Sequence, residues 1–140
     1  MKQQLKSFIQ NYISCFTQYD VKTLQNFYQL PCTLSTPDKL VLITSSEEFE
    51  EEFRQIFTQL KEANTAKFSF KDISFTQVNE AIIMLGGHWT FKDTKQDIFA
   101  DFFACYHLVK ENNKLNIVNV MSHEVENTVT FDEQLVLVQE

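Results

Sequence analysis

The side chains that could take part in catalysis are concentrated in one apolar stretch, residues 97–109. The length and composition of this stretch predict a buried β-strand. Side chains alternate across a strand, so five of these residues would share one face. They are Phe99, Asp101, Phe103, Cys105 and His107. Burial among aromatic side chains favours the neutral form of a carboxyl group, which is the form a general acid needs, so Asp101 is a candidate acid/base. A structural carboxylate near a strand end, paired with a lysine or with a helix, would show the same pattern.

Cysteine and histidine side chains offer a second kind of chemistry, but their spacing does not support it. Cys105 and His107 lie about 7 Å apart along a strand, which is too far for the imidazole to activate the thiol directly. We therefore interpret His107 as a hydrogen-bonded structural histidine. His88 and His123 fall in other segments without an HxH or HxxxH spacing, so neither a metal site nor a cofactor is predicted.

The cysteine count predicts free thiols. The chain has three cysteines, Cys15, Cys32 and Cys105, which is an odd number and includes no CxxC spacing. Each lies among apolar residues, so buried free thiols are expected rather than a disulfide framework.

The first part of the chain shows helical spacing. Residues 5–16 carry apolar side chains at every third or fourth position and predict an amphipathic helix of about four turns. Asp20 is a suitable N-cap for a short second helix, which Pro31 would end. The inward row of this second helix is Val21, Leu24, Phe27 and Tyr28.

A short hairpin and a third helix are predicted next. Residues 32–35 and 40–43 are typical of two short strands around a turn that contains Pro37. Ser45 and Glu48 then form a capping box, and the helix that it starts is predicted to reach about residue 63.

From residue 67 to residue 124 the apolar period changes to two, and tight polar turns join the segments, so an antiparallel meander is predicted. The alternation slips at Lys71 and Asp72, which indicates a bulge. The tail, residues 125–140, contains the apolar run 135–138. That run predicts an extra strand or an arm packed on a partner subunit, because a disordered tail would not normally be so apolar.

Length and charge restrict the class of protein. The chain of 140 residues is expected to form a single domain, residues 1–140, with a core between residues 5 and 124. Its formal net charge of -7 argues against a nucleic-acid partner, because phosphate binding requires a basic face. No apolar run approaches the roughly 20 residues that span a bilayer, and residues 1–6 lack the apolar segment of a signal peptide. A cytoplasmic protein without a membrane partner is therefore the expectation.

This order of elements resembles that of the nuclear transport factor two-like superfamily, a cystatin-type fold shared by ketosteroid isomerases and SnoaL-like polyketide cyclases. The resemblance covers roughly residues 5–124. The residues that carry it are Tyr12 with Ile13, the pattern Asp20, Leu24, Phe27 and Tyr28, the segment 87–91, and the spacing into segments 101–108 and 115–122. It implies an α+β, cone-shaped roll in which three N-terminal helices pack on a curved, mainly antiparallel sheet.

By this resemblance, the strand face that carries Asp101 is the concave, pocket-lining face of the sheet. The implied ligand pocket is formed by Tyr12, Phe16, Leu85, Trp89, Phe91, Phe99, Phe103, Cys105 and His107. Tyr12 falls where ketosteroid isomerases place a tyrosine donor, so Tyr12 and Asp101 are the candidate catalytic residues. The outward row would then be the interface of a homodimer. That row is Ala100, Phe102, Ala104 and Tyr106.

Carried over residue by residue, the isomerase chemistry is incomplete. The general-base carboxylate expected just before the first-strand proline is absent, since Ser35 and Thr36 precede Pro37. Cys105 stands where the second oxyanion donor, an acid, is expected. Steroid-type isomerisation is therefore not predicted.

Three functions remain open from the sequence. The favoured one, since the recognisable catalytic carboxylates are missing, is a non-catalytic accessory domain or a domain that binds a hydrophobic small molecule. The second is a cofactor-free lyase, isomerase or cyclase acting on a hydrophobic carbonyl compound, with Asp101 as acid/base and Tyr12 as donor. The third is a dimeric protein-interaction module that uses the outer sheet face or the tail.

Overall fold

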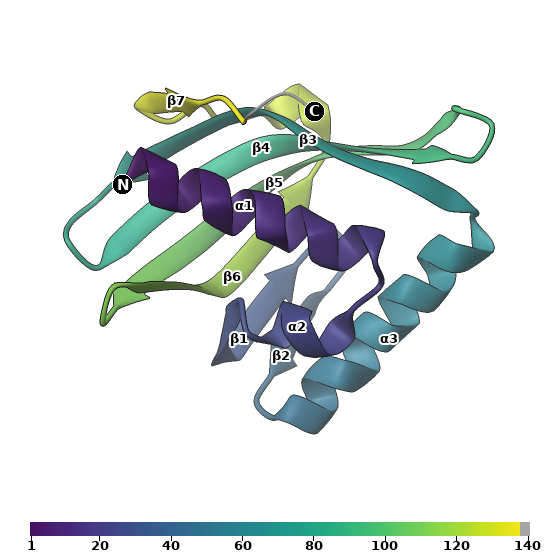
Figure 1. Cartoon of the computed structure of the whole chain (residues 1–140), viewed down its shortest axis with the longest axis horizontal. Coiled ribbons are helices and arrows are strands. Elements are labelled where there is room, and N and C mark those ends of the chain that lie inside the picture. Colours follow the sequence, from purple (N-terminus) through teal and green to yellow (C-terminus); the bar gives the residue numbers. More distant parts are fainter. Residues whose placement is uncertain (138–140) are drawn as a thin grey trace.

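The computed structural model describes residues 1–137, in which three α-helices lie over one face of a β-sheet (Figure 1). The α-helices are α1 (Lys2–Thr17), α2 (Val21–Gln25) and α3 (Ser46–Glu62). The strands are β1 (Tyr28–Ser35), β2 (Leu40–Ile43), β3 (Thr65–Gln77), β4 (Ile82–Asp93), β5 (Ile98–Glu111), β6 (Lys114–His123) and β7 (Glu133–Leu135). No helix within residues 1–137 is long and apolar enough to cross a bilayer.

The sheet has seven strands in the order β2-β1-β6-β5-β4-β3-β7, so the expected α+β fold with a mainly antiparallel sheet is confirmed. Strands β3 to β6 form the predicted antiparallel meander. In β3 the register shifts between Lys71 and Ser74, and Asp72 adopts a φ of 53°, which confirms the predicted bulge. β1 joins the meander by a parallel pairing with β6, which the sequence did not predict.

Capping groups fix the starts of two helices, as predicted. The side chain of Asp20 accepts a hydrogen bond from the Thr23 backbone N–H at 3.1 Å. Ser45 Oγ accepts from the Glu48 N–H at 3.2 Å, and Glu48 Oε1 accepts from the Thr44 N–H at 2.8 Å. Hydrogen bonds to these carboxylates lower the pKa of Asp20 and of Glu48, because they favour the ionised form.

The second helix is shorter than predicted, because β1 begins where the sequence pattern predicts the end of the helix. Tyr28 pairs with Ile117 of β6, and the Ile117 N–H donates to the Phe27 carbonyl oxygen at 2.7 Å. Pro31 therefore lies inside β1 and does not end a helix. The β1–β6 register shifts between Tyr28 and Thr33, around Pro31, which has no N–H to donate to the ladder.

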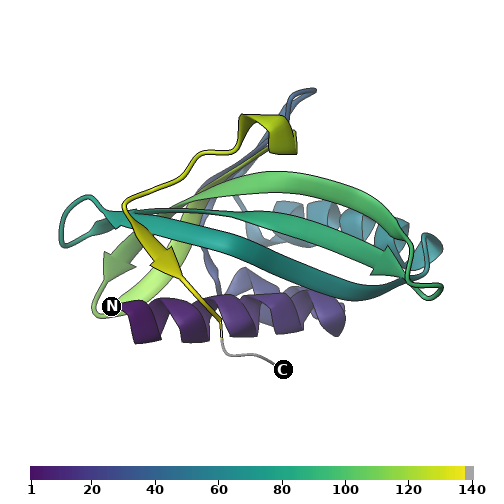
Figure 2. The same ribbon diagram turned by 90° about the horizontal axis from the view of Figure 1, so that it is seen from above.

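The C-terminal segment crosses the outer face of the sheet, opposite α1 (Figure 2). We call residues 124–132 the strap. Within it, the Phe131 N–H donates to Ser74 Oγ at 2.8 Å, and the Phe131 ring lies over Gly86 beside the Phe103 ring. After the strap, β7 pairs with the edge of β3 and buries Leu135, which is the one residue of 135–137 that lies in a strand. Val138, the last residue of the predicted apolar run, lies outside the described residues.

Candidate functional site

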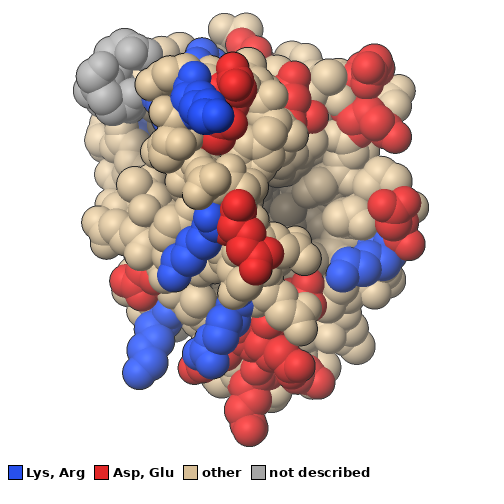
Figure 3. Space-filling view, turned by 90° about the vertical axis from the view of Figure 1, so that its right-hand side faces the viewer, with Lys and Arg blue, Asp and Glu red and all other residues tan. Residues whose placement is uncertain are grey.

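A cavity of about 300 Å³ lies between the concave face of the sheet, α3 and the turn that joins β1 to β2. Its ring-bearing lining residues are Tyr12, Phe16, Tyr28, Phe53, Trp89, Phe91, Phe102 and Tyr106. Figure 3 shows a hollow on the side of the molecule where α3 lies, with an uncharged floor and charged side chains around it. A cavity of this size and lining suits a small, largely apolar ligand.

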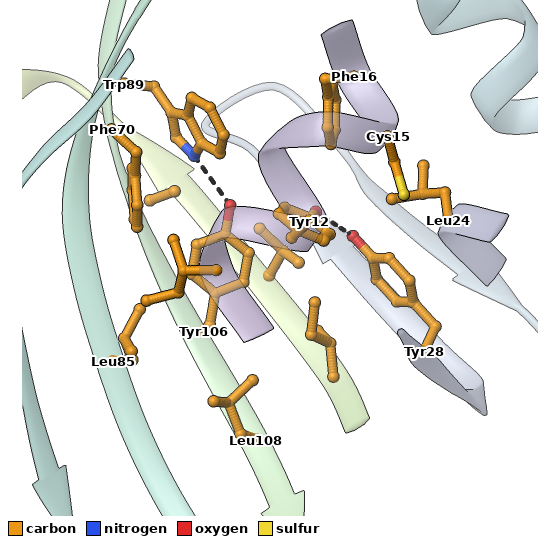
Figure 4. Close-up of a cluster of buried hydrophobic side chains, with 14 of the residues drawn as sticks. Tyr12, Cys15, Phe16, Leu24, Tyr28, Phe70, Leu85, Trp89, Tyr106 and Leu108 are labelled. Atoms are coloured by element: carbon orange, nitrogen blue, oxygen red, sulfur yellow. Dashed lines mark hydrogen bonds between the residues drawn. The ribbon is translucent and has the colours of Figure 1, made fainter. Parts of the chain in front are cut away.

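Polar groups from four elements meet in the wall of this cavity (Figure 4). The hydroxyl oxygens of Tyr12 on α1 and Tyr28 on β1 are 2.6 Å apart, and either group can be the donor. The indole N–H of Trp89 on β4 donates to the hydroxyl oxygen of Tyr106 on β5 at 2.8 Å. The rings of Tyr12 and Tyr106 pack edge to face, with centroids 5.8 Å apart. The three phenols form one buried group, which we call the tyrosine cluster.

Burial determines the protonation of the tyrosine cluster. It raises the pKa of Tyr12, Tyr28 and Tyr106, because a phenolate would lose its hydration in this apolar surrounding. The proximity of Tyr106 further raises the pKa of Tyr12 and Tyr28, since neighbouring phenolates would repel each other. The phenols are therefore neutral at neutral pH, where they can donate hydrogen bonds to a ligand oxygen but cannot act as bases.

Four residues predicted for the pocket line this cavity: Tyr12, Phe16, Trp89 and Phe91. Leu85 lies on the same face of the sheet but beside a separate, much smaller cavity of about 10 Å³. Contact between any of these side chains and a ligand stays a prediction.

Four of the remaining predicted pocket residues lie on the outer face of the sheet, so the predicted orientation of β5 was wrong. They are Asp101, Phe103, Cys105 and His107, which alternate as expected but point away from the cavity. The fifth, Phe99, lies at the β4–β5 register shift, is 43% exposed and packs its ring on Phe91 without lining the cavity. The register gives the reason: Trp89 pairs with Phe102 and Leu85 pairs with Tyr106, and directly paired residues share a face. The row expected to face outward therefore faces inward, and it cannot form the predicted dimer interface. That row is Ala100, Phe102, Ala104 and Tyr106.

Asp101 cannot serve as an acid/base in the cavity, because the sheet separates it from that space. Its Oδ1 is hydrogen-bonded to Nε2 of His88, and both side chains are partly exposed. His88 thus points away from Trp89, as the strand alternation predicts. Asp101 is a structural carboxylate of the outer face, paired with a histidine instead of the expected lysine or helix.

The histidine and cysteine side chains on the outer face and in the core show no activated group. In the part of the chain that the structure describes, the buried Nε2 of His107 has no hydrogen-bond partner, so the prediction of a hydrogen-bonded histidine was wrong for this atom. The cysteines are buried and free, as predicted. Burial raises the pKa of Cys15 and of Cys32 to about 11 and also raises the pKa of Cys105. Among residues 1–137, no group of three or more His, Cys, Asp or Glu side chains is arranged to hold a metal ion.

Sequence reasoning missed several residues of the cavity wall. Tyr28 was assigned to a helix, and Phe102 and Tyr106 were assigned to the wrong face. Glu52 could have been found, because it lies four positions before Ile56 on the inner side of α3. Lys39 carries no such signal, since only the fold brings the β1–β2 turn to α3.

Comparison with known proteins supports the fold but no specific activity. No curated protein matches the sequence. An NTF2-like protein with a cystatin-like fold from Novosphingobium aromaticivorans is 9% identical, with a TM-score of 0.72 over 90% of this chain and 82% of that one. An NTF2-like protein of unknown function from Shewanella oneidensis is 12% identical, with a TM-score of 0.70 over 87% and 98% of the two chains. A ketosteroid isomerase-like protein from Erwinia carotovora atroseptica is 11% identical, with a TM-score of 0.67 over 88% and 95%.

Similarity at these identities shows the fold alone, since one fold can carry many functions. The family is shown by a match of the sequence to a family model. A family model described as NTF2-like protein (DUF6841) matches residues 3–125, a range that contains α1 from its second residue, α2, α3 and strands β1 to β6. The resemblance recognised in the sequence is confirmed, and the chain belongs to the NTF2-like DUF6841 family.

Proposed function

We propose that this chain is a small-molecule-binding domain whose ligand lies in the aromatic cavity. The observation that carries the proposal is a cavity of about 300 Å³ with the tyrosine cluster in its wall. The cavity opens to the surface (Figure 3), and a concave space lined by aromatic side chains with a few polar groups is typical of a small-molecule site. The volume equals the share of about ten water molecules in the liquid, which is enough for a small organic molecule.

The tyrosine cluster supports a ligand that carries an oxygen acceptor. The bond between Tyr12 and Tyr28 uses one of their two hydroxyl hydrogens, and the other is left to donate. The hydroxyl of Tyr106 accepts from Trp89 and also interacts with the Tyr12 hydroxyl, so the three phenols together leave one hydrogen to donate to a ligand. A ligand carbonyl or hydroxyl oxygen beside the cluster would gain about 0.5–1.5 kcal/mol from such a bond.

Binding accounts for the cavity better than catalysis does. Proton transfer next to a carbonyl needs a base within hydrogen-bond reach of the substrate. Asp101 is on the other side of the sheet, and among the described lining residues the only carboxylate belongs to Glu52, which pairs with Lys39. The phenols are donors at neutral pH, so they hold a substrate oxygen but remove no proton.

Fluorescence of Trp89 tests the proposal. Trp89 is the only tryptophan of the chain and is 3% exposed in the cavity wall, so a ligand beside it is expected to change its emission. We expect hits from a library of small aromatic carbonyl compounds, and native mass spectrometry of freshly purified protein would reveal any co-purified molecule. A folded protein that gives no emission change and carries no extra mass would contradict the proposal.

Substitution of Tyr12 tests the role of the tyrosine cluster. Tyr12→Phe removes one hydroxyl and is expected to weaken the binding of oxygen-bearing hits about two- to tenfold, the equivalent of one hydrogen bond. Tyr19→Phe is the matched control, because the Tyr19 hydroxyl donates to the Thr65 carbonyl oxygen outside the cavity. An equal loss in both variants would show that the effect is not a property of the cavity.

A further inference from the structure

Two residues of opposite charge line the aromatic cavity, Lys39 next to the β1–β2 turn and Glu52 on α3. Lys39 Nζ and Glu52 Oε2 are 3.9 Å apart, which is long for an ion pair. The Lys39 side chain is 64% exposed, whereas the Glu52 side chain is only 21% exposed. The ammonium group is therefore largely hydrated, whereas the carboxylate is the more enclosed of these two charged groups.

Glu52 is held firmly but has little polar compensation. It lies next to Phe53, which is 3% exposed, on a helix that is also anchored by the fully buried Phe49. Within residues 1–137, Lys39 is its ion-pair partner, at a distance too long for a hydrogen bond. A partly buried carboxylate keeps its capacity to accept hydrogen bonds, and a cation that reaches it would offset part of its lost hydration.

The aromatic wall favours the same sign of charge. The face of an aromatic ring carries partial negative charge and attracts a cation within about 6 Å of the ring centre, and tryptophan is the most effective ring. Trp89 and Phe53 both line the cavity with Glu52. An anion would be repelled by the carboxylate and by any ring face that it met, and the cation of the described wall, Lys39, is largely hydrated. The net charge of -7 also concentrates cations around the molecule.

We infer that the cavity selects an organic ammonium ion, a protonated amine whose charged head pairs with Glu52 and whose apolar body lies among the aromatic rings. The inference rests on the proposed function, because it names the ligand class of the same cavity. Lys39 is then an internal competitor, which pairs with Glu52 when no ligand is bound and moves into solvent when the ligand ammonium takes its place.

Three probes of matched size and different charge test this inference: phenylpropylammonium, phenylpropanol and phenylpropionate. Each is titrated at neutral pH against Trp89 fluorescence and by calorimetry. In the native protein we expect the ammonium probe to bind about tenfold more tightly than the alcohol, and the carboxylate to bind most weakly. Glu52→Gln is expected to bring the ammonium and the alcohol to within about twofold of each other. Lys39→Met is expected to tighten the binding of the ammonium probe about threefold, because the competitor is removed.

Glu51→Gln is the matched control, because Glu51 is the neighbouring residue, is exposed and lies outside this cavity. It makes the same change in net charge, and it should keep the tenfold preference that the native protein is expected to show. Equal loss of the preference in both variants would assign it to the general charge of the molecule and overturn the role of Glu52. Binding of the alcohol or the carboxylate as tightly as the ammonium would overturn the inference but leave the proposed function standing. No binding of any probe would overturn the inference, while the library screen still decides the proposed function.

Discussion

The phenol groups of Tyr12, Tyr28 and Tyr106 are buried together, and their burial makes the stability of the fold depend on pH. Each group has a folded-state pKa raised above its usual value near 10, mainly because burial disfavours the phenolate. In the unfolded chain the same groups ionise near pH 10. Proton release therefore favours the unfolded state once the pH exceeds that value.

We predict that the free energy of unfolding is unaffected by these groups below about pH 9 and falls steeply above about pH 10. Each phenol that stays protonated in the folded state contributes a slope of about 1.4 kcal/mol per pH unit, since only the unfolded state loses the proton. Urea denaturation at a series of alkaline pH values measures the slope, and Tyr12→Phe should reduce it. Phenolate absorbance near pH 10 that exceeds the contribution of one tyrosine, Tyr19, while the near-ultraviolet circular dichroism stays native would contradict the prediction.

Single residues also show where sequence reasoning reaches its limit. Asp20 and Ser45 were identified correctly as caps, because capping depends on neighbours three positions away. The orientation of Asp101 was predicted wrongly, because both faces of β5 carry apolar residues and alternation alone does not say which face is concave. That choice depends on the pairing of Trp89 with Phe102, a contact between two strands.

At the scale of elements, the strap explains how an apolar outer face is kept from water. Phe103 is 1% exposed although it lies on the face opposite the helices. The ring of Phe103 lies directly on Gly86, where a Cβ atom would approach Phe103 Cζ to 2.6 Å, and Phe131 covers the same glycine from the strap. The C-terminal segment therefore provides a second, smaller hydrophobic layer on the outer face.

We predict that Phe131→Ala lowers the free energy of unfolding by about 1–3 kcal/mol, because the substitution uncovers Phe103 and removes buried ring area. Urea denaturation monitored by Trp89 fluorescence measures the change. Val136→Ala is the control from the same C-terminal segment, since Val136 is 71% exposed and is expected to change stability by less than about 0.5 kcal/mol. Similar stabilities for the native chain and Phe131→Ala would mean that the strap contributes nothing to the fold.

Elements whose boundaries depend on nearby residues were predicted well. The start of β1, which depends on pairing with β6, was not predicted. The third helix, the meander and the bulge at Asp72 follow from periodicity and turn chemistry close in the sequence. The start of β1 does not follow from such local patterns, because Tyr28 fits the helical pattern of the sequence but pairs with Ile117 of β6 in the structure. Long-range pairing overrides local propensity at this position.

At the scale of the whole molecule, part of the outer sheet face stays exposed beyond the strap. Leu40 and Met121 lie on either side of Ser35 in cross-strand register. They are 69% and 44% exposed, which is unusual for large apolar side chains that lie close together. We propose that this exposed part, rather than the inward row that contains Tyr106, is the contact surface of a homodimer.

Native mass spectrometry is expected to show a dimer for the native chain and a monomer for Met121→Lys, because a lysine in an apolar contact would bury an unpaired charge. Val78→Lys provides the comparison, since Val78 is 56% exposed in the β3–β4 turn, away from this surface. A monomeric native chain would contradict the proposal, and so would a dimer that both variants preserve.

The parallel pairing of β1 with β6 has a consequence for when the cavity can exist. The Asn119 side-chain N–H donates to Thr33 Oγ1 at 2.6 Å across 86 positions of the chain, so one wall of the cavity is joined to the sheet by a distant contact. The β1–β2 hairpin carries lining residues such as Ser35 and Val41, and until β6 has been synthesised it has no sheet edge to join. Closing so long a loop costs entropy that the finished meander must offset. A nascent chain therefore forms this cavity only after β6, Lys114–His123, has been synthesised.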